Sequence, residues 1–181
     1  MIWGIVGIIV LIALICVYYI NRIIVLGNRI RNAWAQIDVQ LKKRTDLVPN
    51  LVETVKGYAK HEKEIMGDVT KAHAAMMKAE TPAQKIRAAT GLTAALKSIF
   101  ALAENYPNLK ANENFRLLQE QLEGIENKIA YSRQFYNDSV LEYNNLVTTI
   151  PGAWFAGSMH RTTMEFLEIQ AAERKPVKVK F

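Results

Sequence analysis

The feature that most constrains this chain is the uncharged segment from Ile2 to Ile20. As an α-helix rising about 1.5 Å per residue, it would extend roughly 30 Å, the thickness of one bilayer hydrocarbon core. Trp3 and Tyr19 lie near its two ends, where aromatic side chains settle at membrane interfaces. We therefore predict a single transmembrane anchor over residues 1–22.

A cleaved signal peptide is the alternative interpretation of this segment. Such a peptide needs a basic leading region and small residues at its cleavage site. The chain has no Lys or Arg before the apolar run, and bulky Tyr18, Tyr19 and Ile20 stand where small residues would be needed. The pattern favours an anchor that is retained.

Basic residues are concentrated beside this segment and predict its orientation. Arg22, Arg29 and Arg31 follow it, and no basic side chain precedes it. Since basic flanks stay inside, we expect a single-pass membrane protein with its N-terminus outside and its body in the cytoplasm. Residues 1–60 hold eight Lys or Arg against three Asp or Glu, whereas the rest is nearly balanced. This basic excess would favour contact with anionic lipid headgroups. The alternative is that these charges only set the topology of the protein.

The next constraint is an amphipathic helical pattern over residues 33–62. Its apolar residues recur in steps of three and four, which places them on one stripe of an α-helix. They are Ile30, Trp34, Ile37, Leu41, Val48, Leu51, Val55 and Tyr58. No strong breaker separates this helix from the anchor, although Gly27 could bend it, and Pro49 predicts a kink.

Further helices are predicted over residues 63–80, 82–102 and 112–150. The fold class expected is all-α: the N-terminal transmembrane helix continues into an elongated antiparallel bundle of three to four long helices, a body over residues 23–150. The longest helix keeps a seven-residue average that is typical of bundle or coiled-coil packing.

The C-terminal segment, residues 151–181, is too apolar for a free tail. Some of Trp154, Phe155 and Phe166 should pack against the end of the bundle. We expect a short helix near 162–172 and a short extended strap near the end of the chain.

Polar residues on two of the predicted helices are the candidate functional site. They are Asp38, Arg44, Asp46, Asn50 and Glu53 on the first, and Glu126, Arg133, Asn137 and Asn144 on the longest. One interpretation is a polar face that binds a ligand or partner. The other, which we favour, is an interhelical network that fixes the register of the helices, because no nucleophile with an adjacent base accompanies these residues.

Other chemistry has little support in the sequence. His61 and Glu62 begin a metalloprotease-like run, but Ile65 stands where the second histidine is required. Cys16 lies within the apolar segment and is the only cysteine. The basic triplet at 42–44 lacks interleaved aromatic residues, so nucleic-acid binding is disfavoured. We expect no catalysis, no cofactor and no metal.

Four contiguous pieces carry a family resemblance. They are AWAQIDVQLKKRTDLVPNLVETVKGYAKHE at 33–62, ENYPNLKANENFRLLQEQLEGIENKIAYSRQFYND at 104–138, YNN at 143–145 and PVKVKF at 176–181. The chain resembles the LemA family of bacterial membrane proteins over almost its whole length. The resemblance implies one N-terminal span and a helical-bundle body, and it implies no established activity.

The function expected is a self-associating scaffold, a homo-oligomer that organises or remodels the bacterial membrane. The resemblance agrees, since relatives of the LemA family occur among magnetosome-membrane proteins. The alternative is a non-catalytic adaptor or regulator that docks on another membrane protein such as a protease or transporter. An exposed face around Met66, Met76 and Met77 would suit that role, although filling of the core is the default interpretation of these methionines.

Overall fold

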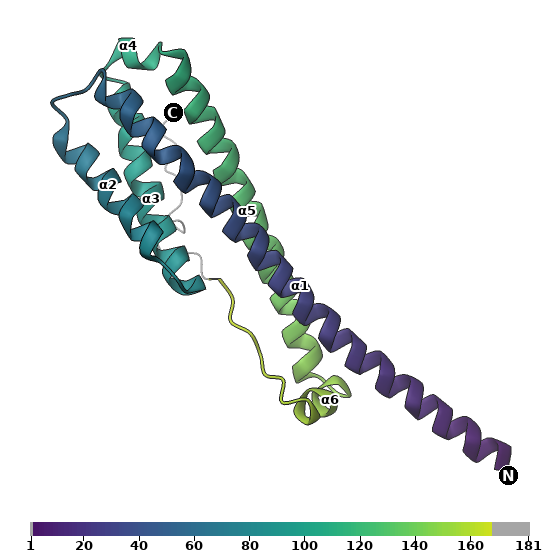
Figure 1. The fold of residues 1–181 in the computed structure, drawn as a ribbon. Coiled ribbons are helices and arrows are strands. Elements are labelled where there is room, and N and C mark those ends of the chain that lie inside the picture. The colour runs from purple at the N-terminus through teal and green to yellow at the C-terminus, as the bar shows by residue number, and fades with distance from the viewer. Residues whose placement is uncertain (1, 168–181) are drawn as a thin grey trace, which may run out of the picture. The chain divides into compact units, whose positions relative to one another are not determined.

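A computed structural model describes residues 2–167 of the chain, and all regular structure in that part is helical. The helices are α1 (Ile2–Lys56), α2 (Lys63–Lys78), α3 (Pro82–Ala103), α4 (Pro107–Lys110), α5 (Glu113–Thr148) and α6 (Gly152–Ser158) (Figure 1). This confirms the all-α bundle and the long apolar N-terminal helix that continues into it.

The first helix is continuous from the apolar segment into the amphipathic one. Gly27 and Pro49 both lie inside α1, and neither ends it. The prediction that this helix reaches residue 62 is wrong, because α1 ends at Lys56 and a turn follows. Tyr58 lies in that turn, where its hydroxyl accepts a hydrogen bond of 2.9 Å from the Asn112 side chain. It therefore does not continue the buried stripe.

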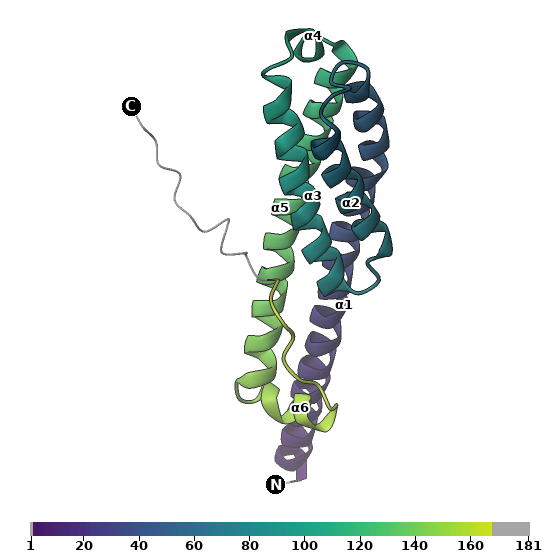
Figure 2. The ribbon, with the colours of Figure 1, turned by 90° about the vertical axis from the view of Figure 1, so that its left-hand side faces the viewer.

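The chain divides into two compact units, residues 37–130 and residues 1–36 with 131–181. In residues 37–130, α2 and α3 lie side by side as a hairpin (Figures 1 and 2). Thr81 and Gln84 form a capping box at the start of α3, as their spacing predicts. The largest fully buried side chains of this unit are Ile37, Leu41, Val48, Leu51, Val55, Leu92, Ile99, Leu109 and Phe115.

The methionines of α2 belong mainly to this core. Met66 and Met76 are buried, and only Met77 of the three is exposed. Flexible thioether side chains fit irregular gaps, so core filling accounts for two of the three. The three therefore do not form one exposed face.

The other unit packs residues 23–30 of α1 against the last part of α5 and against α6. Its buried cluster consists of Ile23, Leu26, Ile30, Val140, Tyr143, Val147 and Ala156. The turn between α5 and α6 requires glycine at position 152, because a Cβ there would lie 2.1 Å from the Leu146 carbonyl oxygen.

The chain that follows α6 is extended over residues 161–167 and runs back along α5 (Figure 2). The short helix expected near 162–172 is therefore absent from residues 162–167, and the remainder of that prediction lies outside the described residues. So does the strap expected near the end of the chain. Phe155 is half-buried against the cluster of this unit, whereas Trp154 and Phe166 are exposed.

Candidate functional site

Arg44 is the most buried charged residue in the part of the chain that the structure describes, at 2 % exposed. It lies on the buried stripe of α1, and its guanidinium pairs with Glu126 of α5. It also donates to Thr93 Oγ1 at 2.8 Å and to the carbonyl oxygen of Ala89 at 3.1 Å, both on α3. A single side chain therefore bonds to two other helices of its unit.

These contacts match the register-fixing interpretation more closely than a ligand site. Removing one partner of a buried ion pair is costly, so Arg44 favours the alignment in which Glu126, Thr93 and Ala89 all face it. A second interhelical pair, Lys85 Nζ to Asp38 Oδ1 at 2.5 Å, joins α3 to α1 in the same unit.

The other candidate residues of α1 lie on its surface. Asp46 pairs with Lys42 at 2.9 Å, and Glu53 pairs with Lys56 at 2.7 Å, both within the helix and exposed. Asn50 is exposed as well. Because these side chains are exposed, they do not belong to the buried network. Exposed ion pairs contribute only about 0–1 kcal/mol to stability.

The candidate residues of α5 make a different kind of contact. Asn144 donates to the carbonyl oxygen of Met164 at 2.9 Å and accepts from the Met164 backbone N–H at 2.8 Å. Asn137 does the same with Leu167, at 3.1 Å and 2.9 Å. We call Asn137 and Asn144 the amide clamp and residues 161–167 the clamped segment.

The spacing of the amide clamp matches an extended chain. Seven helical residues rise about 10.5 Å, and three extended residues span about 10 Å. Asn137 and Asn144 are therefore as far apart as Leu167 and Met164, and the segment runs antiparallel to α5. The clamp contacts only backbone atoms of the segment, so it selects an extended conformation rather than a sequence.

Tyr136 adds a third contact with the clamped segment. Its hydroxyl donates to the carbonyl oxygen of Glu165 at 3.4 Å, and its ring meets that of Trp34 edge-on at a centroid distance of 6.4 Å. Burial, and next the charge of Glu165, raise the pKa of Tyr136. The phenol therefore stays protonated, and can donate this hydrogen bond, at pH values above its ordinary pKa. Arg133, the remaining candidate, is half-buried on α5.

Glu142, which is not among the residues predicted from the sequence, bridges two of the basic residues beside the apolar segment. Arg29 Nη1 lies 2.9 Å from Glu142 Oε2, and Arg22 pairs with Glu142 Oε1. Arg29 also lies over the Phe135 ring, 5.0 Å from its centroid. Arg22 and Arg29 are seven residues apart on α1, and this spacing was the available signal that one acid could serve both.

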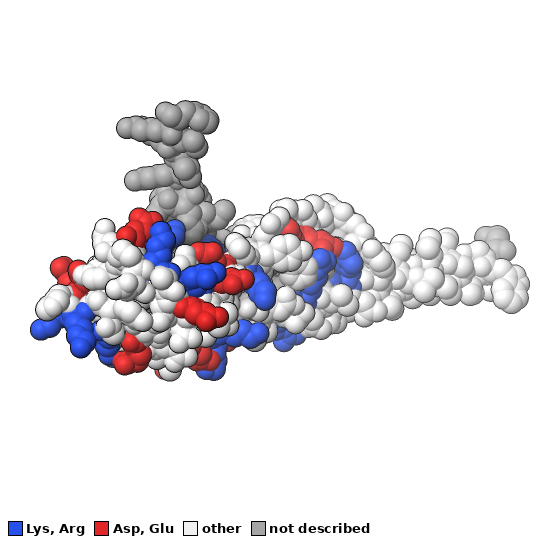
Figure 3. All heavy atoms as spheres, turned by 90° about the horizontal axis from the view of Figure 1, so that it is seen from above, with Lys and Arg blue, Asp and Glu red and all other residues white. Residues whose placement is uncertain are grey.

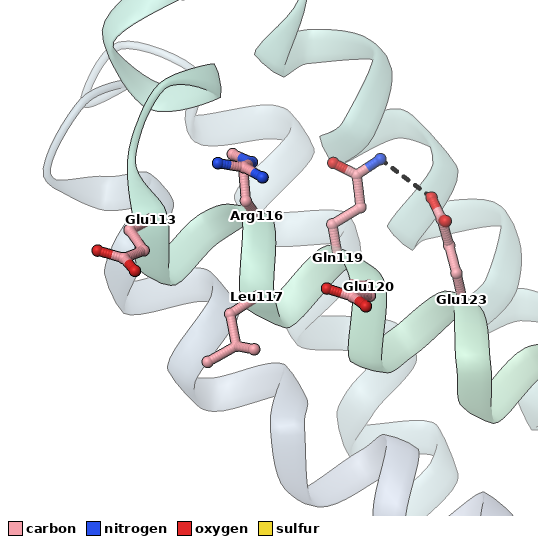
Figure 4. A pocket seen from close by; sticks show the side chains of 6 residues that line it. All are labelled: Glu113, Arg116, Leu117, Gln119, Glu120 and Glu123. Atoms are coloured by element: carbon pink, nitrogen blue, oxygen red, sulfur yellow. Dashed lines mark hydrogen bonds between the residues drawn. The ribbon is translucent and has the colours of Figure 1, made fainter.

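A surface hollow over the start of α5 is lined by Glu113, Arg116, Leu117, Gln119, Glu120 and Glu123 (Figure 4). All six residues come from one helix, and Gln119 donates to Glu123 at 3.0 Å. It is an open stretch of solvated helix surface rather than an enclosed site. Among residues 2–167, no three His, Cys, Asp or Glu side chains are grouped to hold a metal ion.

The fold and these contacts define an all-α protein with one exposed apolar N-terminal helix long enough to cross a membrane and a clamped C-terminal segment. The chain belongs to the LemA family, which matches residues 33–181. The apolar segment precedes the matched region. No curated protein matches the sequence.

Proposed function

We propose that this protein is a membrane-anchored scaffold that associates with itself in the bacterial inner membrane. The observation that carries the proposal is the first part of α1. No residue of its most apolar window is buried, and this segment carries no charged side chain (Figure 3). Exposure of the nineteen residues from Ile2 to Ile20 to water would be strongly unfavourable, and a lipid bilayer removes that apolar surface from water. The other apolar helix that passes the same length test, α3, is partly buried and belongs to the core of its own unit.

The same segment offers a surface for contact between copies. Gly4 and Gly7 lie one turn apart on α1, and among the described residues nothing outside the nearby backbone of this helix comes within 4 Å of a Cβ placed on either. Small residues allow transmembrane helices to approach closely. Confinement to a membrane raises the effective concentration of such helices, so weak contacts suffice for a symmetric homo-oligomer.

The basic flank supports a body on the cytoplasmic side. Arg22 and Arg29 remain about 43 % exposed beside Glu142, so they stay accessible to anionic headgroups. Reporters that work on one side only, fused to Phe181, test this orientation. Activity of a reporter that requires the outside would contradict it.

The mass of the full-length protein in native-lipid particles tests self-association. We expect an oligomer, and Gly4→Leu with Gly7→Leu should shift it towards monomer, because two bulky side chains separate the helices. Ile9→Leu, in the same segment, is the matched control and should leave the oligomer unchanged. A monodisperse monomer of the unaltered protein, in both mild detergent and native lipid, would reject the scaffold.

The amide clamp supports a second candidate function, an adaptor that binds an extended segment of another membrane protein in place of residues 161–167. Met164→Pro removes the N–H that Asn144 accepts from and so loosens the internal segment without altering the clamp. The full-length Met164→Pro variant should bind a labelled peptide of residues 161–167 more tightly than the unaltered protein. Adding Asn144→Ala should abolish the binding. No binding by Met164→Pro would reject this function.

A further inference from the structure

The short helix α6 is fixed against α1 at the end of the apolar segment. The ring of Phe155 lies flat on the ring of Tyr19, with centroids 5.4 Å apart and planes 8° apart. Ala156 is buried in the same cluster as Ile23, one turn further along α1. Two contacts on successive turns of α1 therefore set the level of α6 along that helix.

Large apolar side chains of this region face away from the cluster. Trp154 on α6 is 67 % exposed, and Ile150 just before it is 71 % exposed. Tyr18, next to the stacked Tyr19, is exposed as well. Nothing that the structure describes covers these side chains, and they gather at one level of α1.

Two segments of this unit lack ionic side chains. Residues 143–160 contain no Lys, Arg, Asp or Glu, and the same is true of residues 2–21. The charged residues that border these segments in the sequence are Arg22, Glu142 and Arg161, and Arg22 pairs with Glu142 between α1 and α5. Two segments far apart in the sequence therefore form one uncharged region of this unit, and the Arg22–Glu142 ion pair lies at its border.

We propose that α6 is a second membrane contact, with Trp154 and Ile150 seated in the headgroup and acyl boundary of the bilayer that α1 crosses. The proposal rests on the membrane anchoring proposed above. Trp3 and Tyr19 are separated by about 24 Å along the helix, which places Tyr19 near the boundary on the side of the body. A helix stacked on Tyr19 lies at the same depth, where tryptophan is the favoured residue.

Lipid fits this surface better than a second copy of the chain because the surface is continuous with the lipid-facing side of α1. At the level of Tyr19 the bilayer surrounds α1, so a group held to its side meets lipid unless another protein displaces it. An uncharged helix with an outward Trp154, preceded by the exposed Ile150, suits burial of about 5–10 Å into this boundary. The half-exposed Arg22 and Arg29 lie where anionic headgroups would attract them.

The three tryptophans of the chain allow the depth to be measured on the full-length protein in liposomes. Pairwise Trp→Phe substitutions leave Trp3, Trp34 or Trp154 as the only tryptophan. Lipids brominated at shallow or deep acyl positions then quench the tryptophans that they contact. We expect quenching of Trp154 to be several-fold stronger than that of Trp34, and strongest with shallow bromines. Trp34 is the internal control, since it lies about 22 Å beyond Tyr19 along α1.

The outcomes separate this inference from the anchoring itself. Quenched Trp3 with unquenched Trp154 would overturn the second contact and leave the anchor in place. Trp154 that is unquenched by lipid and also shielded from iodide in water would show that protein covers this surface, which overturns the proposal as well. If Trp3 is also unquenched, the anchoring fails. A Gly157→Ala variant of the Trp154-only protein should give the same quenching, because a Cβ there meets nothing within 4 Å.

Discussion

Asn144 and Met164, twenty residues apart in the sequence, are joined by two hydrogen bonds that use both polar atoms of the amide and both polar groups of the peptide backbone. Asn137 repeats this arrangement with Leu167. The amide clamp thus satisfies backbone groups of an extended segment that has no strand partner in the described residues. A helix face performs the role that a neighbouring strand performs in a sheet.

Asn144→Ala should release the clamped segment without unfolding the helices. Two neutral hydrogen bonds contribute about 1–3 kcal/mol together, and 1.4 kcal/mol is a tenfold change in a local opening equilibrium. We therefore expect trypsin to cleave after Arg161 roughly 5 to 150 times faster in the folded variant than in the unaltered protein.

Asn145→Ala is the matched control, because Asn145 is exposed on the next position of α5. Its cleavage rate should stay near that of the unaltered protein. Equal rates for Asn144→Ala and Asn145→Ala would show that the segment is held by other contacts, such as the half-buried Met164.

The helical periodicity of the sequence predicted most of the helices that the structure contains. The helix predicted over residues 82–102 matches α3, Pro82–Ala103, within one residue, and the capping box of Thr81 lies at its start. The end of α1 was misplaced because Tyr58 continues the apolar spacing, whereas the chain turns after Lys56. Spacing reports which face a side chain would occupy in a helix, and it does not report whether the helix continues.

The candidate polar residues were only partly interpretable for a similar reason. The shared face of Asn137 and Asn144 follows from their separation of seven residues. The identity of their partner does not follow from the sequence, because the amide clamp bonds to backbone groups, which every residue has. The partner of Arg44 was equally hidden, since the contact with Glu126 depends on how α1 and α5 are aligned.

Loss of the Glu126 carboxylate should destabilise the fold, because the buried Arg44 pairs with it. Glu126→Ala leaves the guanidinium of Arg44 inside without its carboxylate, which costs 3–5 kcal/mol in a fully buried pair. Because the Glu126 side chain is 43 % exposed, water reaches the pair, and we expect about 1–2 kcal/mol in the free energy of unfolding.

Chemical denaturation of the full-length protein in micelles measures this loss. The control is Lys42→Ala, which breaks the exposed pair with Asp46 and should cost less than about 0.5 kcal/mol. Equal stability of the two variants would show that the stability of the fold does not depend on the pairing of Arg44 with Glu126.

Tyr106 should make the stability of the body sensitive to high pH. Its hydroxyl donates to Glu62 Oε1 at 2.8 Å. That bond, with smaller contributions from burial and the carboxylate charge, raises the pKa of Tyr106 above its ordinary 10.0. The unfolded chain then loses this proton first, so the stabilisation is complete below about pH 10 and falls as the pH rises through the raised pKa.

Tyr106→Phe isolates this contribution. The difference in melting temperature between the unaltered protein and the variant should be constant near neutral pH and should shrink above about pH 10. Glu62→Gln should return the ionisation of Tyr106 towards the ordinary range in an absorbance titration. A difference that stays constant through the alkaline range would show that the Glu62 bond does not favour the protonated phenol.

Gly152→Ala should disrupt the turn between α5 and α6, whereas Gly157→Ala should be tolerated. A Cβ at position 152 would lie 2.1 Å from the Leu146 carbonyl oxygen, which is backbone and has little room to move. At position 157 a Cβ meets nothing within 4 Å, and alanine is favoured over glycine in a helix by about 1 kcal/mol. Thermal unfolding of the full-length protein should therefore show a lower midpoint for Gly152→Ala and an equal or higher midpoint for Gly157→Ala. Equal midpoints for the two variants would mean that the α5–α6 turn relaxes freely around a Cβ at position 152.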